Sequence, residues 1–234
     1  THLFGDTSME ARVADRLLAD DAPLSLLETA DAPAETDGRY GERVGDILVP
    51  ETVTLGDTLT IGRFEVTRAQ FHAYDADYDV PSGTADYPAN GVSAEQAEAY
   101  VEWLSAQTGR SYRLPTADEL EALKAARSGP SENTPAYWAG FTPNPDEYRD
   151  LRARLDERAP DALLMTVGSR PPGHGADGAG PLVYDVDGNV AEWARTDEGL
   201  APRNGSVLTL NDPRAESMPE APRRATGIRV VLDQ

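Results

Sequence analysis

The stretch YDVDGNVAEW, residues 184–193, joins a run of oxygen-bearing side chains to the start of an apolar segment. Counted as an EF-hand loop from Asp185, its positions 1, 3 and 5 carry two aspartates and an asparagine, which are suitable calcium ligands. Position 6 should then be glycine and position 12 glutamate, but they hold Val190 and Thr196. The EF-hand interpretation therefore fails, and the loop needs another explanation.

Outward from this stretch, three segments carry the signal of a helix start. In each, a Ser or Thr that can cap the helix is followed three residues later by a Gln or Glu that can reach back to it. Apolar residues then recur at helical spacing, and Gly109 and Gly129 end the second and third helices. The sequence therefore predicts helices that begin at the pairs Thr67 and Gln70, Ser93 and Gln96, and Thr116 and Glu119.

Strand signals flank these helices. Residues 46–66 alternate apolar and polar side chains between Gly and Pro breaks, and residues 205–210 and 227–234 are two short strand candidates near the end. Helical spacing of apolar residues predicts further helices at residues 8–19 and 146–158. Helices in the middle and short strands at both ends predict an α+β domain whose termini meet in one sheet.

The chain divides into an arm and a folded domain. Residues 1–40 combine the predicted first helix with a stretch rich in Ala, Pro and acidic residues, which is typical of a linker. Residues 41–234 form the predicted folded domain, and a chain of 234 residues with 39% hydrophobic content can bury a core of that size.

The charge is strongly negative. There are 41 acidic residues against 21 basic ones, a formal net charge of -20, and Lys124 is the only lysine. Such a surface repels phosphate backbones, so nucleic-acid binding is disfavoured. Adaptation to a salty environment, or a genomic base composition that favours Arg over Lys, explains this composition better than an acidic docking face.

The residue inventory restricts the chemistry. The chain has no cysteine, which excludes disulfides, thiolate metal sites and cysteine nucleophiles. Its three histidines, His2, His72 and His174, do not fall at HxxxH or HExxH spacing. No apolar run approaches the ~20 residues of a membrane span. The sequence starts without an initiator Met or a signal-type segment, which suggests a processed protein and leaves export open.

The ordered segments GRFEVTRAQF, YRLPTADELEALKAAR, YDVDGNVAEW, NGS and GIRVV resemble the formylglycine-generating enzyme family, also called sulfatase-modifying factors. The resemblance runs from about Ile61 to Val231. It implies an irregular α+β fold related to C-type lectin-like domains, with short strands and about three to five helices, commonly stabilised by calcium.

The resemblance also offers a role for the opening stretch. In the family, the corresponding loop binds calcium through side-chain and backbone oxygens, which carry over to Asn189, Val190 and Glu192. Oxygen ligands of this kind suit calcium. The alternative is that Asn189 and Glu192 only tie the loop backbone into the core. The segment that holds a second calcium in the family is replaced here by residues 146–158, so no second site is assigned.

The catalytic metal of the family has no ligands in this chain. Family enzymes oxidise a substrate cysteine with a copper ion held by two cysteine thiolates, and Cu(I) requires soft ligands of that kind. The equivalent positions fall near Thr209 and Arg214, and neither residue can replace a thiolate. Copper and a catalytic residue are therefore not assigned, which leaves calcium as the one expected cofactor, and the sequence favours a protein that is not an enzyme.

Several conspicuous residues have structural interpretations. Arg113 and Arg229 are expected to form buried charge pairs, with Glu65 and Glu192 as candidate partners. His72 is expected on a helix surface. The remaining assignments are a solvated rim for Asp75, Asp77 and Asp79, an exposed loop for His174, and packing roles for Trp103, Trp138 and Trp193.

The sequence thus favours a non-catalytic member of this family that acts as a binding or scaffold subunit, with a protein partner or larger complex that is periplasmic or secreted. One alternative is an enzyme that reuses the family groove without cysteine, as relatives that work with a partner domain's iron do. A three-histidine ligand set for such a metal is absent from this chain. The other is a lectin-like protein that binds sugar or peptide through the loops between Gly129 and Gly180, with aromatic candidates Tyr137, Trp138, Phe141 and Tyr148.

Overall fold

The fold is a mixed α+β arrangement of short elements, as expected from the sequence. A computed structural model describes residues 40–56, 59–125, 133–134, 164–168, 183–209 and 221–233. The predicted helices at residues 8–19 and 146–158, and nearly all of the predicted arm, lie outside this part of the chain. The described α-helices are α3 (Arg68–His72), α4 (Ala94–Thr108) and α5 (Ala117–Ala125), and a 3-10 turn, η2, spans Arg223–Ala225.

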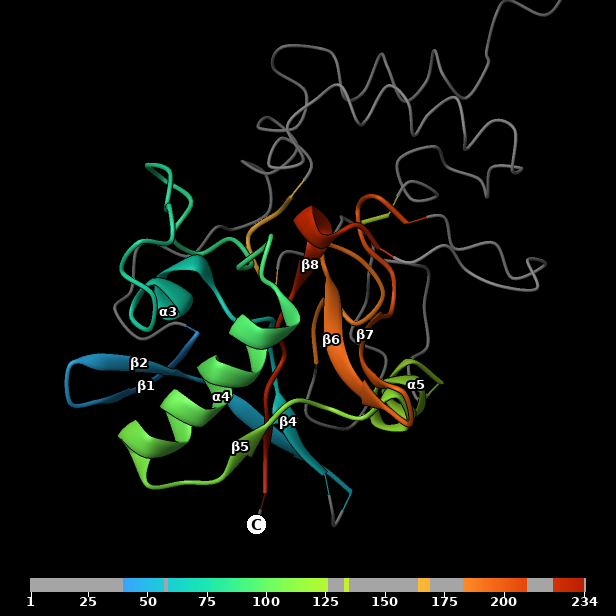
Figure 1. The fold of residues 1–234 in the computed structure, drawn as a ribbon, viewed down its shortest axis with the longest axis horizontal. Helices are drawn as coiled ribbons and strands as arrows, with labels where there is room; N and C mark the ends of the chain where they lie inside the picture. Colours follow the sequence, from blue (N-terminus) through green and yellow to red (C-terminus); the bar gives the residue numbers. More distant parts are fainter. Residues whose placement is uncertain are drawn as a thin grey trace, which may run out of the picture.

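Three small sheets surround the helices (Figure 1). A hairpin pairs β1 with β2, a four-stranded sheet has the order β3-β4-β9-β5, and a three-stranded sheet has the order β7-β6-β8. The expected meeting of the chain's two ends is confirmed, because β9 pairs antiparallel with β4. The strands are β1 (Gly41–Val44), β2 (Ile47–Pro50), β3 (Thr52–Leu55), β4 (Leu59–Gly62), β5 (Tyr112–Arg113), β6 (Ala191–Thr196), β7 (Gly199–Arg203), β8 (Thr226–Gly227) and β9 (Val231–Leu232).

The helix starts form as the sequence predicts. At α3 and α4, the capping side chain accepts from the backbone three residues on, and the Gln there reaches back to the cap. The same reciprocal bonds join Thr116 and Glu119 at the start of α5. Gly109 ends α4 with a left-handed φ of 68°, a conformation that glycine adopts without a Cβ penalty. These local signals therefore set the positions of the helices.

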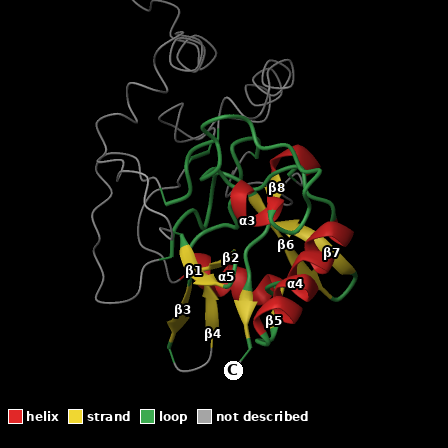
Figure 2. Ribbon diagram, turned by 90° about the vertical axis from the view of Figure 1, so that its left-hand side faces the viewer, coloured by secondary structure: helices red, strands yellow, loops and turns green. Residues whose placement is uncertain are grey.

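Two apolar clusters form within the described residues, and their members come from the helices, strands and loops that Figure 2 distinguishes by colour. The larger one packs the buried face of α4, including Tyr100 and Leu104, against Phe71 of α3 and against Ile228. The smaller one packs Leu120 and Leu123 of α5 against Ile61, Val186, Ala194 and Val231. Together they fix the loop before β6 between α5 and the four-stranded sheet.

One strand prediction was wrong. Residues 205–209 form a turn, and the strand in this part of the chain is β7, which precedes them. Asn204 has a left-handed φ of 66°, which interrupts extended backbone. The Ser206 hydroxyl then accepts a hydrogen bond from the Leu208 backbone N–H at 3.1 Å, so the chain curls back on itself.

Candidate functional site

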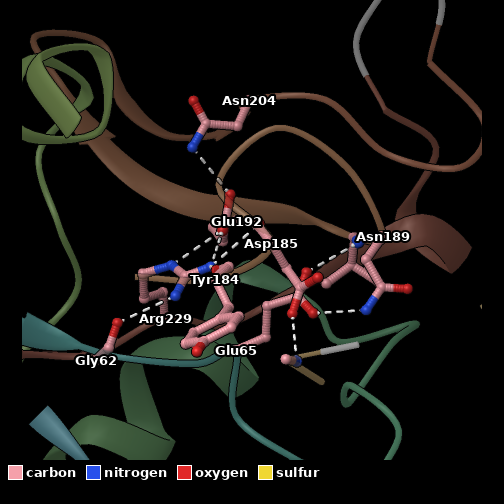
Figure 3. Close-up of polar contacts among 10 residues, drawn as sticks. Gly62, Glu65, Tyr184, Asp185, Asn189, Glu192, Asn204 and Arg229 are labelled. Carbon is pink, nitrogen blue, oxygen red and sulfur yellow. Dashed lines mark hydrogen bonds and ion pairs between the residues drawn. The ribbon is translucent and has the colours of Figure 1, made fainter. Parts of the chain in front are cut away.

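Five buried side chains form a polar cluster where the loop before β6 meets β4 and β9 (Figure 3). Arg229 lies between β8 and β9, Glu65 follows β4, and Glu192 belongs to β6. The remaining two come from the loop itself, where Asp185 and Asn189 have left-handed φ values of 55° and 62°. Asp and Asn are the non-glycine residues that most readily adopt this conformation. The members of this buried polar cluster are Glu65, Asp185, Asn189, Glu192 and Arg229.

Asn189 is hydrogen-bonded at every polar atom. Its Nδ2 donates to Glu65 Oε2 at 2.8 Å and to the Met165 carbonyl at 3.1 Å. Its Oδ1 accepts from Asn133 Nδ2 and from the Met165 backbone N–H, both at 3.0 Å. The backbone N–H donates to the Asn133 carbonyl, and the backbone carbonyl accepts from the Val207 N–H. An asparagine amide has two donors and two acceptor sites, so its side chain is fully used.

The Glu65 carboxyl also binds the loop that contains Asn189. Its Oε1 accepts from the Val190 backbone N–H at 3.0 Å, while Oε2 accepts from Asn189. The nearby carboxyl of Asp185 accepts from the Gly168 backbone N–H at 2.6 Å. Burial raises the pKa of Glu65 well above its usual range, and the negative charges of Asp185 and Glu192 raise it further. The cluster therefore favours a protonated Glu65.

Glu192 and Arg229 form a fully buried ion pair, with both side chains 0% exposed. Oε1 of Glu192 accepts from Arg229 Nε at 3.1 Å and from Nη2 at 2.9 Å, and its Oε2 accepts from Asn204 Nδ2 at 3.1 Å. Arg229 also donates to the carbonyls of Gly62 and Tyr184. Burial raises the pKa of Glu192 to about 7, while the charge and hydrogen bonds of Arg229 act to lower it.

The expected charge pairs are confirmed for one arginine and wrong for the other. Arg229 pairs with Glu192, as predicted. Arg113 instead pairs with Glu119 at 2.7 Å and with Asp233 at 2.8 Å, at 23% exposure of its own side chain. The reason is local, since Glu119 at the first turn of α5 lies next to Arg113 at the end of β5. This pair also lowers the pKa of Glu119, mainly through the hydrogen bond from Arg113.

The three predicted calcium ligands lie close together in sequence, and two of them, Asn189 and Glu192, have side-chain oxygens that are already engaged by protein groups. The Asn189 amide is saturated by protein groups, and both oxygens of Glu192 already accept hydrogen bonds. Within the described residues, no group of three or more His, Cys, Asp or Glu side chains is arranged to hold a metal ion. These hydrogen bonds compete with a metal ion for the oxygens of Asn189 and Glu192, and calcium binding by Asn189, Val190 and Glu192 stays a prediction.

At the position expected for the first copper ligand, Thr209 is buried and its hydroxyl lies 2.6 Å from that of Ser206. Gly205, which precedes Ser206, packs closely against Asp187. A Cβ at this position would lie 2.8 Å from Asp187 Oδ1, so only glycine fits. Asp187 Oδ1 is in turn paired with Lys124 of α5 at 2.8 Å. Arg214, the second predicted position, lies outside the described residues. Hydroxyl, carboxylate and ammonium groups thus occupy this region.

Other singled-out residues have ordinary settings where they are described. His72 is exposed on α3 and its Nδ1 lies 2.9 Å from the Tyr78 carbonyl, as predicted for a surface histidine. Trp103 and Trp193 pack against the larger apolar cluster. Asp77 and Asp79 are exposed and Asp75 is half-buried, which agrees with a solvated rim. His2, Trp138 and His174 lie outside the described residues, as do Tyr137, Phe141 and Tyr148.

Sequence reasoning missed one residue and one contact in this region. Asn133 was not singled out, although its side chain and its carbonyl both bind Asn189. Asp185 was counted among the oxygen-bearing side chains suited to calcium, but its contact with Gly168 was not foreseen. No local sequence pattern identifies Asn133, because its partner is 56 residues away in the chain. Glu65, which follows a strand of alternating pattern, was expected to meet an arginine and instead binds Asn189 and the backbone of Val190.

Comparison with known proteins gives a family and three structural neighbours. A family model described as sulfatase-modifying factor enzyme 1-like domain matches residues 29–233. PvdO from Pseudomonas aeruginosa is 21% identical, with 75% of this chain and 80% of that chain covered and a TM-score of 0.42. CarF is 18% identical, with coverage of 81% and 95% and a TM-score of 0.42. The Treponema denticola variable protein 1 is 19% identical, with coverage of 83% and 91% and a TM-score of 0.43.

Two further findings are negative, one from comparison with curated proteins and one from the lengths and hydropathy of the helices. No curated protein matches the chain. Among the helices of the described residues, none is both long enough and apolar enough to cross a membrane.

Proposed function

This chain belongs to the family of sulfatase-modifying factor enzyme 1-like domains, and we propose that it is a non-catalytic member that serves as a binding or scaffold subunit of a larger assembly. The observation that carries the proposal is the combination of a retained family framework with a missing copper-ligand set. None of the 234 residues is a cysteine, and hydroxyls occupy the surroundings of Thr209. Hydroxyl oxygens are hard ligands that do not replace thiolates for Cu(I).

The retained framework supports a binding role. The capped helices and the buried Glu192–Arg229 pair hold the loops of the domain in defined positions. A surface whose loops are fixed in advance binds a partner with a smaller loss of conformational entropy. The partner is expected to be a protein, because the net charge of -20 disfavours nucleic acid.

We expect no copper-dependent conversion of a cysteine to formylglycine by this protein. The purified chain, loaded with Cu(I), would be incubated with a sulfatase-type cysteine peptide and the peptide mass followed over time. A family enzyme with both cysteines serves as the positive control. Appearance of the aldehyde product at a rate that depends on copper would contradict the proposal, because it would require a ligand set other than two thiolates.

The scaffold role has its own test. The full-length protein, tagged and recovered from its native source, is expected to elute in size exclusion with a partner at a fixed molar ratio. Quantitative mass spectrometry and light scattering measure that ratio across the peak. Elution as a free monomer under conditions that preserve weak complexes would contradict the scaffold role, while leaving the absence of oxidase activity as a separate result.

A further inference from the structure

We propose that the Asn189 side-chain amide, rather than a calcium ion, is the centre that holds the loop of residues 183–190 in this chain. Both hydrogen-bond donors and hydrogen-bond acceptors surround the Asn189 amide. Two N–H donors, from Asn133 and Met165, point at its Oδ1, while a Glu65 oxygen and the Met165 carbonyl receive its Nδ2 hydrogens. A cation gathers oxygen ligands and does not attract N–H donors. A mixed set of donors and acceptors suits an amide.

This amide connects segments that are far apart in the sequence. Through six hydrogen bonds, the side chain and backbone of Asn189 reach Glu65, Asn133, Met165 and Val207. Bound calcium stabilises loops in the same manner, by drawing groups from different segments to one point. In this chain, the neutral amide makes those connections without an ion.

The acidic member of the predicted calcium set is also neutralised internally. Glu192 faces the guanidinium of Arg229 at 2.9 Å, and both side chains are 0% exposed. A divalent cation bound to Glu192 would lie beside this buried positive charge, and the repulsion between them is strong in a low-dielectric interior. The ion pair and the amide centre therefore both disfavour calcium binding at this loop.

The substitution Asn189→Asp distinguishes a loop held by the Asn189 amide from a loop held by a calcium ion. Asp has the same shape and also tolerates the left-handed φ of 62°, so the backbone is not strained by the change. It removes the two donors to Glu65 and Met165 and adds a negative charge beside the Glu65 carboxyl. At a calcium site the added charge would bind the ion at least as well, whereas at an amide centre it breaks the network.

We expect Asn189→Asp to lower the melting temperature by roughly 5 °C or more, equally in calcium and in chelator. Asn204→Asp is the matched control, because Asn204 has a similar φ of 66° but, among the described residues, its side chain donates a single hydrogen bond, to Glu192. The melting temperature of this control variant is expected to fall by less than half as much. Wild-type melts in calcium and in chelator are expected to superimpose, with no calcium retained in metal analysis.

Three outcomes would overturn the proposal. They are a calcium-dependent rise in the wild-type melting temperature that persists or grows in Asn189→Asp, rescue of Asn189→Asp by calcium, and an unchanged melting temperature for Asn189→Asp. A calcium-dependent rise of equal size in both proteins counts against the proposal in this way, because aspartate would bind the ion at least as well as asparagine does. If Asn189→Asp does not fold, Asn133→Ala, which removes one donor to Asn189, replaces it in the same comparison.

Discussion

Replacing Arg229 with methionine is expected to lower the free energy of unfolding by about 3–5 kcal/mol, the range for removing one partner of a buried ion pair. Arg229 is 0% exposed and binds Glu192 through Nε and Nη2. Methionine fills much of the same volume but donates no hydrogen bond. Glu192 would be left buried without its counter-charge, and the carbonyls of Gly62 and Tyr184 would lose their donor.

The chain provides a matched control in Arg113→Met. Arg113 also makes a short ion pair, 2.7 Å from Glu119, but its side chain is 23% exposed. Water can replace its hydrogen bonds and screens its charge, so the expected loss is only about 1 kcal/mol or less. The two variants therefore make the same chemical change in a dry and in a wetter environment.

Chemical denaturation followed by circular dichroism at pH 8, above the pKa of about 7 of Glu192, gives both free energies. The prediction is tested by the difference between the two variants in their loss of free energy of unfolding. Equal losses would mean that burial of the Arg229 pair adds nothing to its importance. A variant Arg229→Met that cannot be folded, alongside a folded Arg113→Met, agrees with the expectation, because a loss of this size is a large part of the stability of a typical domain.

Local signals in the sequence were sufficient to place the helices. The pairs at Thr67, Ser93 and Thr116 act within one turn, so their hydrogen bonds depend on the chain nearby and not on the rest of the fold. The pairing of the two ends in one sheet also followed from the pattern of apolar residues near both ends. The fold class could therefore be predicted from these patterns, whereas the family was predicted from the resemblance of the ordered sequence segments.

The polar contacts inside the domain could not be predicted in the same way. Asn189 binds Glu65 across 124 positions of the sequence, and no spacing rule connects residues at that distance. Arg113 shows the opposite error, because a distant partner was expected and the nearby Glu119 took its place. The strand expected at residues 205–210 failed since its apolar pattern does not reveal the turn that Ser206 stabilises. A sequence pattern thus identifies buried polar residues more reliably than it identifies their partners.

The buried polar cluster also predicts an unusual pH dependence of stability. Burial, followed by the charges of Asp185 and Glu192, raises the pKa of Glu65 well above the ordinary value of 4.5, against the lowering effect of Arg229. Burial likewise raises the pKa of Glu192 to about 7. The folded state therefore keeps protons that the unfolded chain has already released. By linkage, stability is fully present below about pH 4.5 and is lost as the pH rises toward 7 and beyond.

We expect the wild-type protein to be more stable at pH 5 than at pH 8. Glu119, whose pKa is lowered by Arg113, contributes in the opposite direction, but its contribution is lost only as the pH falls below the ordinary glutamate range. Measurements between pH 5 and pH 8 therefore report mainly on the groups with raised pKa. The measurement is the denaturant midpoint at each pH, at constant ionic strength.

The substitution Asp185→Asn is expected to reduce this pH dependence and to raise stability at pH 8. Asparagine keeps an oxygen that can accept from the Gly168 N–H and tolerates the left-handed φ of 55°, while it removes the negative charge that faces Glu65 in Figure 3. Asp77→Asn removes the same charge from an exposed position and controls for the general relief of repulsion in so acidic a protein. If both variants keep the wild-type slope between pH 5 and pH 8, the Glu65–Asp185 contact is not its source. If the wild type is more stable at pH 8, the raised pKa values themselves are wrong, and the cluster is held by ionised carboxylates.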